Sequence, residues 1–585
     1  MPDNNISTTR FGPLLTNRGV TFRLWAPAAR QVDLILERRI PMRQDAEWFV
    51  LEVPQAGVGT RYRFRIDDDI EIPDPASHFQ PEDVHGPSEV IDHAYHWECS
   101  DWKGRPWSDA VFLEAHVGTF TPEGTFRAMI ERLDHLIATG ITALELMPVS
   151  DFPGRRNWGY DGALLFAPDS SYGRPEDLKA LIDAAHARGL MVFLDAVYNH
   201  FGPEGNYLGR GAPQFFSDAQ TPWGGAIDYR VPEVRRFAIE NALHWLRAYR
   251  FDGLRLDAVH AIATRGKPDI LVELSRAVGK FAQVSGRHIH LVLENDDNSA
   301  NLLAPDEEPA SGRYRAQWND DYHHVWHVLL TGEGQSYYRD YGQTRHLVRS
   351  LSQGFAYQGE PSRHRCGRQR GEPSGHLPPA AFVNFLQNHD QIGNRPLGER
   401  LTALAKPDAL AAALSVLLLQ PSPPLLFMGE EWGASEPFPF FCDFKGELAA
   451  AVRKGRKREF AEAYACHANI PDPISPDTRA SAVLDWDAIT RPEHARRLAL
   501  TRSLLDVRRR AIVPLLAAIG DSEASFDDGV LSGRWQAGSK VLKLLANLTD
   551  LTLRRAEMNW GEPIWGGEPA RELPPWSVYA AIGDA

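Results

Sequence analysis

Short apolar runs that alternate with amphipathic segments fill the middle of the chain. The apolar runs lie at residues 111–117, 143–149, 190–197, 251–259, 288–295, 314–320, 381–388 and 424–430. Segments between them, such as 175–189 and 233–249, carry apolar residues at helical spacing. Because strands that alternate with helices form parallel βα units, these eight strands predict an α/β fold, a closed (β/α)8 TIM barrel. We assign residues 109–505 to this barrel.

Both ends of the chain carry a different pattern, in which single apolar and polar residues alternate. Near the N-terminus, residues 20–27, 31–37, 47–54 and 60–67 alternate in this way and are separated by Pro and Gly. This pattern predicts an N-terminal β-sandwich over residues 1–98, followed by a polar linker that contains Pro and Trp. Near the C-terminus, residues 530–538, 540–549, 551–558 and 577–583 are again strand-like. They predict a C-terminal β-domain over residues 510–585.

Composition and charge exclude several classes of protein. With 43% hydrophobic and 24% charged residues in 585, the chain is typical of a multidomain globular protein. A formal net charge of −14 disfavours nucleic acid or an anionic membrane as a partner. We interpret the one arginine-rich stretch, 363–370, as a solvated polar loop, with a polyanion site as the alternative. No long apolar stretch or leader pattern occurs, so we expect a cytoplasmic protein.

Two residue types add weaker signals. The four cysteines are far apart and form no Cys-x-x-Cys or Cys/His metal spacing, so we expect free, buried thiols. The 16 Trp residues suit a sugar-binding protein, because pyranose faces stack on flat aromatic rings, although most Trp residues in a chain of this size belong to the core.

Carboxylates follow several neighbouring strands of the predicted barrel, at the end where barrel enzymes place their chemistry. Asp195 ends the third strand, Arg255 and Asp257 end the fourth, Glu294 ends the fifth, and Asp390 follows the seventh. A single such residue is commonly a helix cap. Four neighbouring strands with carboxylates at one rim would repel one another, so the joint pattern indicates a functional site.

The fourth and fifth strands supply residues for two different chemical roles. Arg255 and Asp257 are two residues apart on a strand and therefore share a face, which would keep Asp257 ionised. Glu294 follows an apolar run, and apolar surroundings raise the pKa of a carboxyl group, as a general acid requires. A carboxyl pair of this kind suits glycoside hydrolysis. A divalent-metal site is the competing interpretation, but no His-x-x-x-His or Asp-x-Asp-x-Asp spacing is present.

Four motifs resemble the signature regions of the α-amylase superfamily: DAVYNH at 195–200, GLRLDAVH at 253–260, LENDDN at 293–298 and NHDQIGN at 388–394. The resemblance implies a retaining glycosidase in which Asp257 is the nucleophile, Glu294 the general acid/base and Asp390 a third, supporting carboxylate. The N-terminal FRLWAPAA at 22–29 is similar to the immunoglobulin-like, carbohydrate-binding sandwich of members that act on branched or unusual α-glucans.

The same resemblance implies further contacts with the sugar. The implied substrate-binding residues around the cleaved bond are Tyr160, His200, Arg255, His260 and His389. Many α-amylases bind calcium through the residue that matches Asn199, but this sequence lacks the Asp-rich insertion that normally completes that site. We therefore expect no metal and no other cofactor.

Within the superfamily, VYNHFGPEGNYL at 197–208 and QNHDQIGNR at 387–395 are similar to members that cut the α-1,4 bond next to the terminal trehalose of maltooligosyltrehalose and release trehalose. Recognition of the leaving trehalose then requires polar groups beyond the carboxylates. Our candidate is WNDDYHH at 318–324, expected as a loop, with contact residues Asp320, Asp321, His323, His324 and, from the seventh-strand motif, Asn394. A solvated surface loop remains the alternative. So do a glucan branching enzyme or transferase and a non-catalytic carbohydrate-binding barrel.

Overall fold

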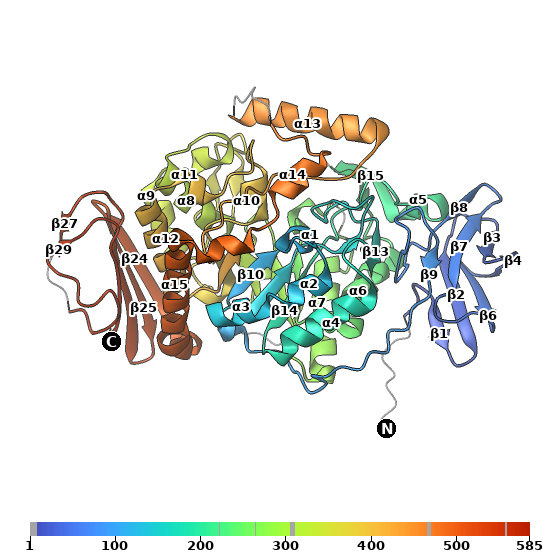
Figure 1. Ribbon diagram of the computed structural model, residues 1–585, viewed down its shortest axis with the longest axis horizontal. Coiled ribbons are helices and arrows are strands. Elements are labelled where there is room, and N and C mark those ends of the chain that lie inside the picture. The colour runs from blue at the N-terminus through green and yellow to red at the C-terminus, as the bar shows by residue number, and fades with distance from the viewer. Residues whose placement is uncertain (1–8, 222, 264, 305–310, 465–469, 556–558) are drawn as a thin grey trace.

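The computed structural model describes residues 9–585 except 222, 264, 305–310, 465–469 and 556–558. Three parts follow one another along the long axis of the molecule (Figure 1). A β-sandwich built from the N-terminal residues lies at one end, a barrel occupies the middle, and a C-terminal antiparallel sheet lies at the other end.

The middle part is a closed barrel of eight parallel strands, as the sequence predicted. In barrel order the strands are β10 (Phe112–Ala115), β11 (Ala143–Leu146), β14 (Met191–Ala196), β17 (Gly253–Leu256), β18 (His290–Leu293), β19 (Ala316–Trp318), β22 (Phe382–Phe385) and β23 (Pro424–Phe427). Every one lies within an apolar run of the sequence. Gly253 is required by close packing inside the barrel, because a Cβ there would lie 2.1 Å from a ring carbon of Phe193.

Helices cover the outside of the barrel. The longer ones are α4 (Pro175–Ala187), α6 (Pro232–Ala248), α7 (Ile270–Ser285), α8 (Asp320–Thr331), α9 (Thr344–Ser352), α12 (Pro407–Leu419) and α15 (Pro492–Val507). Helices α4 and α6 fall within the two segments with helical spacing, and each has Pro in its first turn, where the missing N–H costs nothing. The helix α13 (Gly446–Tyr464) lies across the top of the barrel in Figure 1.

The N-terminal part is a sandwich of two antiparallel sheets, which confirms the sequence prediction. One sheet has the order β1-β2-β6-β5 and the other β4-β3-β7-β8, with β9 added to β7. The four predicted strands are β2 (Gly19–Trp25), β3 (Val32–Ile35), β6 (Trp48–Val53) and β7 (Arg61–Ile66). The short strands are β1 (Leu14–Thr16), β4 (Arg39–Pro41), β5 (Arg43–Asp45), β8 (Ile70–Ile72) and β9 (Ser88–Glu89). The inward residues of the two sheets, among them Phe22, Phe49 and Phe64, form a core separate from that of the barrel.

The C-terminal sheet has the order β24-β25-β26-β30-β28. Three of its strands were predicted: β25 (Val530–Ala537), β26 (Lys540–Asn547) and β30 (Val578–Asp584). The predicted segment 551–558 contributes β27 (Leu553–Arg554), which pairs with β29 (Glu572–Leu573), and its residues 556–558 lie outside the described part. The sequence analysis did not identify β24 (Ile519–Asp527), which is polar and largely exposed, or β28 (Glu562–Trp565), which is only four residues long and contains Pro.

Three other sequence expectations can be compared with the structure. Cys99, Cys366 and Cys442 are free thiols, but only Cys442 is buried and Cys366 is exposed. Cys466 lies outside the described residues. Within the described ranges, no helix combines the length and apolar character needed to span a membrane.

Candidate active site

Arg255 is the centre of the carboxylate rim. Its guanidinium group is fully buried and packs 4.1 Å from the ring centroid of Trp318. Its Nη1 donates to both carboxylate oxygens of Asp195, at 2.8 and 2.7 Å, and to Oδ1 of Asp257 at 2.7 Å. Its Nη2 lies 3.7 Å from Oε2 of Glu294. One cation therefore joins the carboxylates of three neighbouring strands, of which the sequence analysis expected only the contact with Asp257.

Glu294 is held on the neighbouring strand by a strained turn. Ala258 adopts a left-handed conformation with φ of 39°, which is unfavourable for a residue with a Cβ. This turn points the backbone N–H of Ala258 at Oε2 of Glu294, 2.6 Å away. Burial raises the pKa of Glu294 well above its ordinary value, and the charges of Asp257, Asp320 and Asp390 raise it further against the effect of Arg255. Glu294 is thus suited to hold a proton.

His389 links the seventh strand to the first. Glu114, on β10, accepts from the backbone N–H of His389 at 3.1 Å and also contacts Nδ1 of its ring. On the other side of the ring, Nε2 lies 3.4 Å from Oδ1 of Asp390. Burial disfavours the charged ring, but the Asp390 and Glu114 carboxylates outweigh it and raise the pKa of His389 well above its ordinary value.

The opposite shift occurs at Asp390. Burial raises the pKa of Asp390, but the charge and hydrogen bond of His389 bring it below the ordinary value for aspartate.

The neighbour of Glu114 in the barrel, Glu145, is also buried, and neither of its oxygens has a hydrogen-bond partner among the described residues. Burial raises the pKa of Glu145 well above its ordinary value, and the charge of Glu114 raises it further.

Aromatic rings and amide groups border the carboxylates. Tyr160 donates its hydroxyl to Asp195 at 2.6 Å and stacks on His389, with ring centroids 5.0 Å apart. His200 contacts the carbonyl of Tyr160 through Nε2 at 2.9 Å. Asn199 donates to Oδ2 of Asp257 at 3.2 Å, and its amide oxygen contacts Nδ1 of His200 at 2.9 Å. These predicted residues are therefore brought together around Asp257.

We expected the segment WNDDYHH to be a loop. It is instead the end of β19 and the first turns of α8. Asn319 is the N-cap, so the helix starts directly at the barrel rim. Of this segment, Trp318 packs against Arg255, and Asp320 accepts from Nε2 of Gln391 at 3.2 Å. Burial and the charges of Asp390 and Asp296 raise the pKa of Asp320 to about 7.

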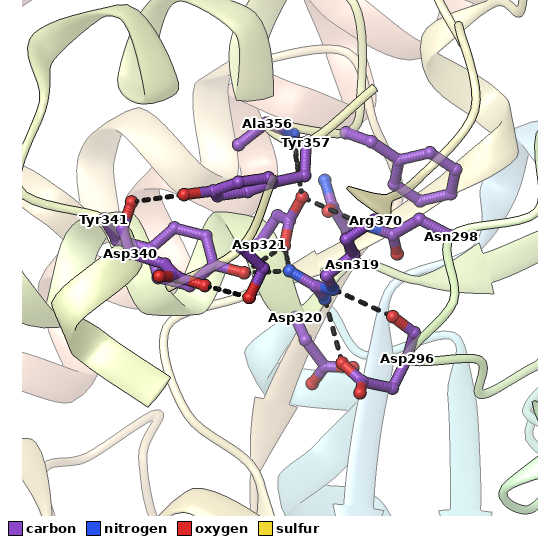
Figure 2. Close-up of polar contacts among 12 residues, drawn as sticks. Asp296, Asn298, Asn319, Asp320, Asp321, Asp340, Tyr341, Ala356, Tyr357 and Arg370 are labelled. Atoms are coloured by element: carbon purple, nitrogen blue, oxygen red, sulfur yellow. Dashed lines mark hydrogen bonds and ion pairs between the residues drawn. The ribbon is translucent and has the colours of Figure 1, made fainter. Parts of the chain in front are cut away.

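Asp321, the next residue, points away from the rim into a network of hydrogen bonds (Figure 2). It is fully buried and accepts from the backbone N–H groups of Ala356 and Tyr357 at 2.8 and 3.0 Å. Its other oxygen accepts from Nη1 of Arg370 at 2.6 Å and from the hydroxyl of Tyr341 at 2.5 Å.

The two histidines of the segment are likewise occupied within the protein. His323 contacts the carbonyl of Leu386 and the hydroxyl of Tyr338. His324 packs against the ring of Tyr341, with centroids 4.7 Å apart. The structure therefore does not bring Asp321, His323 and His324 to the carboxylate rim.

Two arginines of the stretch 363–370 are not part of a solvated loop, which corrects our interpretation. Arg370 is 5% exposed and lies between Asp321 and Asp296 (Figure 2). Its Nη2 is 3.0 Å from Oδ1 of Asp296, and its Nε donates to the carbonyl of the same residue at 2.9 Å. Arg365 binds Asp296 and also Asp297, at 2.8 Å. Because Asp296 follows Glu294 so closely, these arginines fix the chain that carries the acid.

Two other predicted residues lie at the edge of this arrangement. Nδ1 of His260 accepts from the backbone N–H of Asp296 at 3.1 Å, so its ring supports the same segment. Asn394 accepts from Nη1 of Arg456, on α13, at 3.1 Å, which directs its amide oxygen toward that helix.

Sequence reasoning missed several residues of the site. Glu114 and Glu145 interrupt otherwise apolar strands, and a charge in such a strand was the available signal. Trp223 stacks on His200 with centroids 4.9 Å apart and an interplanar angle of 18°, although 44% of it is exposed. Trp223 lies in a short irregular hairpin, β15–β16 (Phe216–Thr221 and Gly224–Ile227), and for this reason no local pattern identified it.

A buried guanidinium group, a carboxylate hydrogen-bonded to it and a buried glutamate with a raised pKa at one barrel rim are the groups needed for acid-assisted attack on a glycosidic bond. Fold and site together define an α-amylase-type glycosidase. Comparison with known families agrees, since residues 96–214 match the alpha amylase catalytic domain and residues 10–76 match carbohydrate-binding module 48, the isoamylase N-terminal domain.

Known proteins narrow the class further. Malto-oligosyltrehalose trehalohydrolase from Deinococcus radiodurans is 42% identical over 94% of this chain and 91% of its own length. The protein of the same name from Saccharolobus solfataricus is 41% identical over 81% and 83%. The chain belongs to the malto-oligosyltrehalose trehalohydrolase family, and it is a glycosidase.

Solved structures agree with this placement. A crystal structure from Salmonella typhimurium, which carries a provisional alpha-amylase name, superposes with a TM-score of 0.95 at 43% identity, covering 99% of this chain and all of that one. A pullulanase from Paenibacillus barengoltzii superposes with a TM-score of 0.73 at 20% identity and shares the fold.

Proposed function

We propose that the chain hydrolyses the α-1,4-glucosidic bond next to the terminal trehalose of maltooligosyltrehalose and releases trehalose, as a step of trehalose biosynthesis. The relatives named for this activity support the choice of substrate. The observation that carries the chemistry is the position of Asp257 and Glu294 on the same buried guanidinium group of Arg255.

In the first step, Asp257 attacks the anomeric carbon of the glucose that precedes the trehalose unit. Hydrogen bonds from Arg255 and Asn199 stabilise its ionised form and aim its carboxylate. Glu294, which burial keeps protonated, gives its proton to the departing glycosidic oxygen. A covalent glycosyl ester on Asp257 and free trehalose result.

In the second step, the ionised Glu294 takes a proton from water, and the oxygen of that water attacks the same anomeric carbon. The bond to Asp257 breaks, its carboxylate is restored, and two inversions give net retention. Retention is checked by following the anomeric protons of the shortened glucan by NMR, in which the α-anomer must appear first.

Asp390 and the aromatic residues hold the sugar that is attacked. The low pKa of Asp390 keeps it as an acceptor for sugar hydroxyl groups, and His389 beside it is a charged donor. Tyr160 offers a ring face beside them, and Trp223 with His200 forms a second flat surface. These groups favour a bound pyranose over an extended polar ligand.

On the leaving-group side we assign the direct contact to Asp320. Its raised pKa lets it act as donor or acceptor toward a trehalose hydroxyl group. Asp321, His323 and His324 then act indirectly, because the hydrogen bonds of the first two and the packing of His324 on Tyr341 fix the first turns of α8. His260 and Asn394 have the same supporting role toward Asp296 and α13.

A product assay tests the proposal. Maltooligosyltrehalose and a plain maltooligosaccharide of equal length are incubated with the enzyme, and the products are separated by chromatography. We expect rapid release of trehalose from the first and slow cleavage of the second. Asp257→Ala must abolish release. Asp134→Asn changes an exposed side chain that is not part of the site, and it must not abolish release. New α-1,6 branches in place of trehalose would identify a branching enzyme instead.

Two further parts of the proposal concern the need for a metal ion and the location of the enzyme in the cell. We propose that catalysis needs no metal ion, so exhaustive chelation should leave trehalose release unchanged. We place the enzyme in the cytoplasm, a reducing compartment in which unpaired thiols such as Cys99, Cys366 and Cys442 persist. Cell fractionation followed by immunoblotting checks this location.

A further inference from the structure

Three histidines meet on the outside of the barrel, in a place that the catalytic proposal does not use. His78 lies in the loop between the sandwich strands β8 and β9, His93 follows β9 on the way to the barrel, and His244 lies on α6. The ring centroids are 4.7 to 4.9 Å apart in all three pairs. One ring nitrogen of each histidine lies within 4.8 Å of the other two, a spacing that a small inward movement of the rings would turn into a shared binding site.

Two of the ring nitrogens already stand at the separation of metal ligands. Nδ1 of His78 and Nε2 of His93 are 3.1 Å apart and share a hydrogen bond, whose proton must move to another ring nitrogen for both to bind an ion. Nitrogen ligands on a tetrahedral zinc ion, at bond lengths of about 2.0 to 2.1 Å, lie about 3.4 Å from each other. The third ring has a defined tautomer, because Nε2 of His244 lies 3.1 Å from the carbonyl of Phe166, which can only accept. Nδ1 of His244 is therefore the nitrogen with a free lone pair, in the manner of histidine ligands held by a carbonyl.

Burial lowers the pKa values of the three rings, which favours binding of a cation over binding of a proton. It lowers the pKa of His78 to about 4 and the pKa values of His93 and His244 well below the ordinary value. All three are neutral at pH 7, so no proton competes with an ion for these rings.

One positive charge opposes binding. Nζ of Lys179 donates to the carbonyl of His93 at 2.9 Å, and its charge contributes to the low pKa of each of the three histidines. Burial lowers the pKa of Lys179 itself to about 8, so this amine loses its charge at a mildly basic pH. An ion in the cluster should therefore bind more tightly when Lys179 is neutral or absent.

We propose that His78, His93 and His244 bind a divalent transition-metal ion such as Zn²⁺, which joins the last part of the N-terminal sandwich and the segment after it to helix α6. Imidazole ligands favour zinc, nickel, copper and cobalt over magnesium or calcium. Three histidines leave one tetrahedral position for water. The ion cross-links two parts of the chain that are 151 residues or more apart, and it therefore stabilises the folded state without entering the catalytic rim.

The test uses the full-length enzyme after removal of metals. Co²⁺ is titrated while the visible absorption is recorded, because tetrahedral cobalt with nitrogen ligands absorbs far more strongly than hydrated cobalt. Zn²⁺ affinity is measured by competition with a chromogenic chelator, and thermal unfolding is followed with and without Zn²⁺. We expect a single site, the tetrahedral cobalt spectrum, and a higher unfolding midpoint with Zn²⁺. Trehalose release should not change.

Variants separate this site from adventitious binding. His93→Ala and His244→Ala should weaken Zn²⁺ binding by at least about 10-fold, as loss of groups around metal sites does. His288→Ala, at an exposed histidine, is the control and should bind as the unaltered chain does. Lys179→Met should tighten binding and remains informative if a histidine variant does not fold. Equal affinity in all variants, an octahedral cobalt spectrum or no binding at millimolar Zn²⁺ would overturn the proposal.

Discussion

Glu114, on the first barrel strand, binds both the backbone N–H and the ring of His389, which follows the seventh strand 275 residues later. Because the other side of the ring faces Asp390, the imidazole is enclosed between two carboxylates. Both ring nitrogens then donate, and the charge on His389 keeps Asp390 ionised.

This relationship predicts a change in the pH profile of Glu114→Gln. The raised pKa of His389 means that the charged ring is present below that pKa and is lost as the pH rises through it. Without the Glu114 charge the pKa of His389 falls, so the basic limb of the profile of kcat should move to lower pH. The loss at the optimum should be about 10- to 100-fold, since a hydrogen bond to a charged group contributes about 1.5 to 3 kcal/mol.

Glu145→Gln is the matched control for this measurement. Glu145 is the register neighbour of Glu114 and is buried to the same degree, but neither of its oxygens has a hydrogen-bond partner among the described residues, so it does not bind His389. We expect its pH profile to coincide with that of the unaltered enzyme. A shift of equal size in both variants would show that general disturbance of the barrel, rather than His389, causes the effect.

Arg255→Met should destabilise the fold as well as abolish activity. Removal of the guanidinium group leaves Asp195 and Asp257 without their buried partner, and such a change costs about 3 to 5 kcal/mol. The midpoint of thermal unfolding, followed by circular dichroism, should fall markedly. Adding Asp195→Asn should restore part of the midpoint, because one of the unpaired carboxylates is then removed. An unchanged midpoint in Arg255→Met would contradict the central place of this cation.

Trp223→Ala should weaken substrate binding without affecting stability. The ring is 44% exposed and its described stacking partner is His200, so the folded state loses little. Stacking of flat rings contributes about 0.5 to 1.5 kcal/mol, which corresponds to a rise in KM of about 2- to 12-fold. Steady-state kinetics on maltooligosyltrehalose measure it. Trp223→Phe keeps a flat face and should retain most of the affinity, whereas equal losses in both variants would argue against stacking.

Acid should destabilise the enzyme partly through Glu333. Hydrogen bonds from His327, and then from Arg395, lower the pKa of Glu333 from its ordinary 4.5 to about 2. Because this pKa is depressed in the folded state, the stabilisation is complete above pH 4.5 and disappears as the pH falls toward 2. Glu333→Gln should lower the unfolding midpoint at pH 6 but much less at pH 3. The control Glu523→Gln, at an exposed side chain, should have no pH-dependent effect.

The sequence predicted the barrel because each of its strands is an apolar run at least as long as the strand itself. It failed at β24, whose residues IGDSEASFD expose most of their side chains and so lack an apolar signal. Among the rim residues, Asp257 and Glu294 could be predicted because they end strands. The charge of Glu114 within an apolar strand was a signal, but its contact with His389 could not be predicted, since it depends on closure of the barrel and not on any local spacing.

The leaving-group side shows a second limit of sequence reasoning. WNDDYHH offers several polar groups in one short segment, but helical geometry turns them in different directions. Asp320 therefore faces the rim while Asp321 faces Arg370. A run of arginines at 363–370 gave no sign that some of its members are buried, because the acidic partners come from other loops.

The two arginines that hold Asp296 also suggest how new specificities could be selected in the laboratory. Arg365 and Arg370 fix the segment after Glu294 from a hairpin that belongs to no barrel strand. A library that varies the exposed positions 363, 368 and 369 while keeping these two arginines would reshape the approach to the leaving group and leave the catalytic carboxylates in place. The barrel would then serve as a fixed reaction centre under an exchangeable recognition surface.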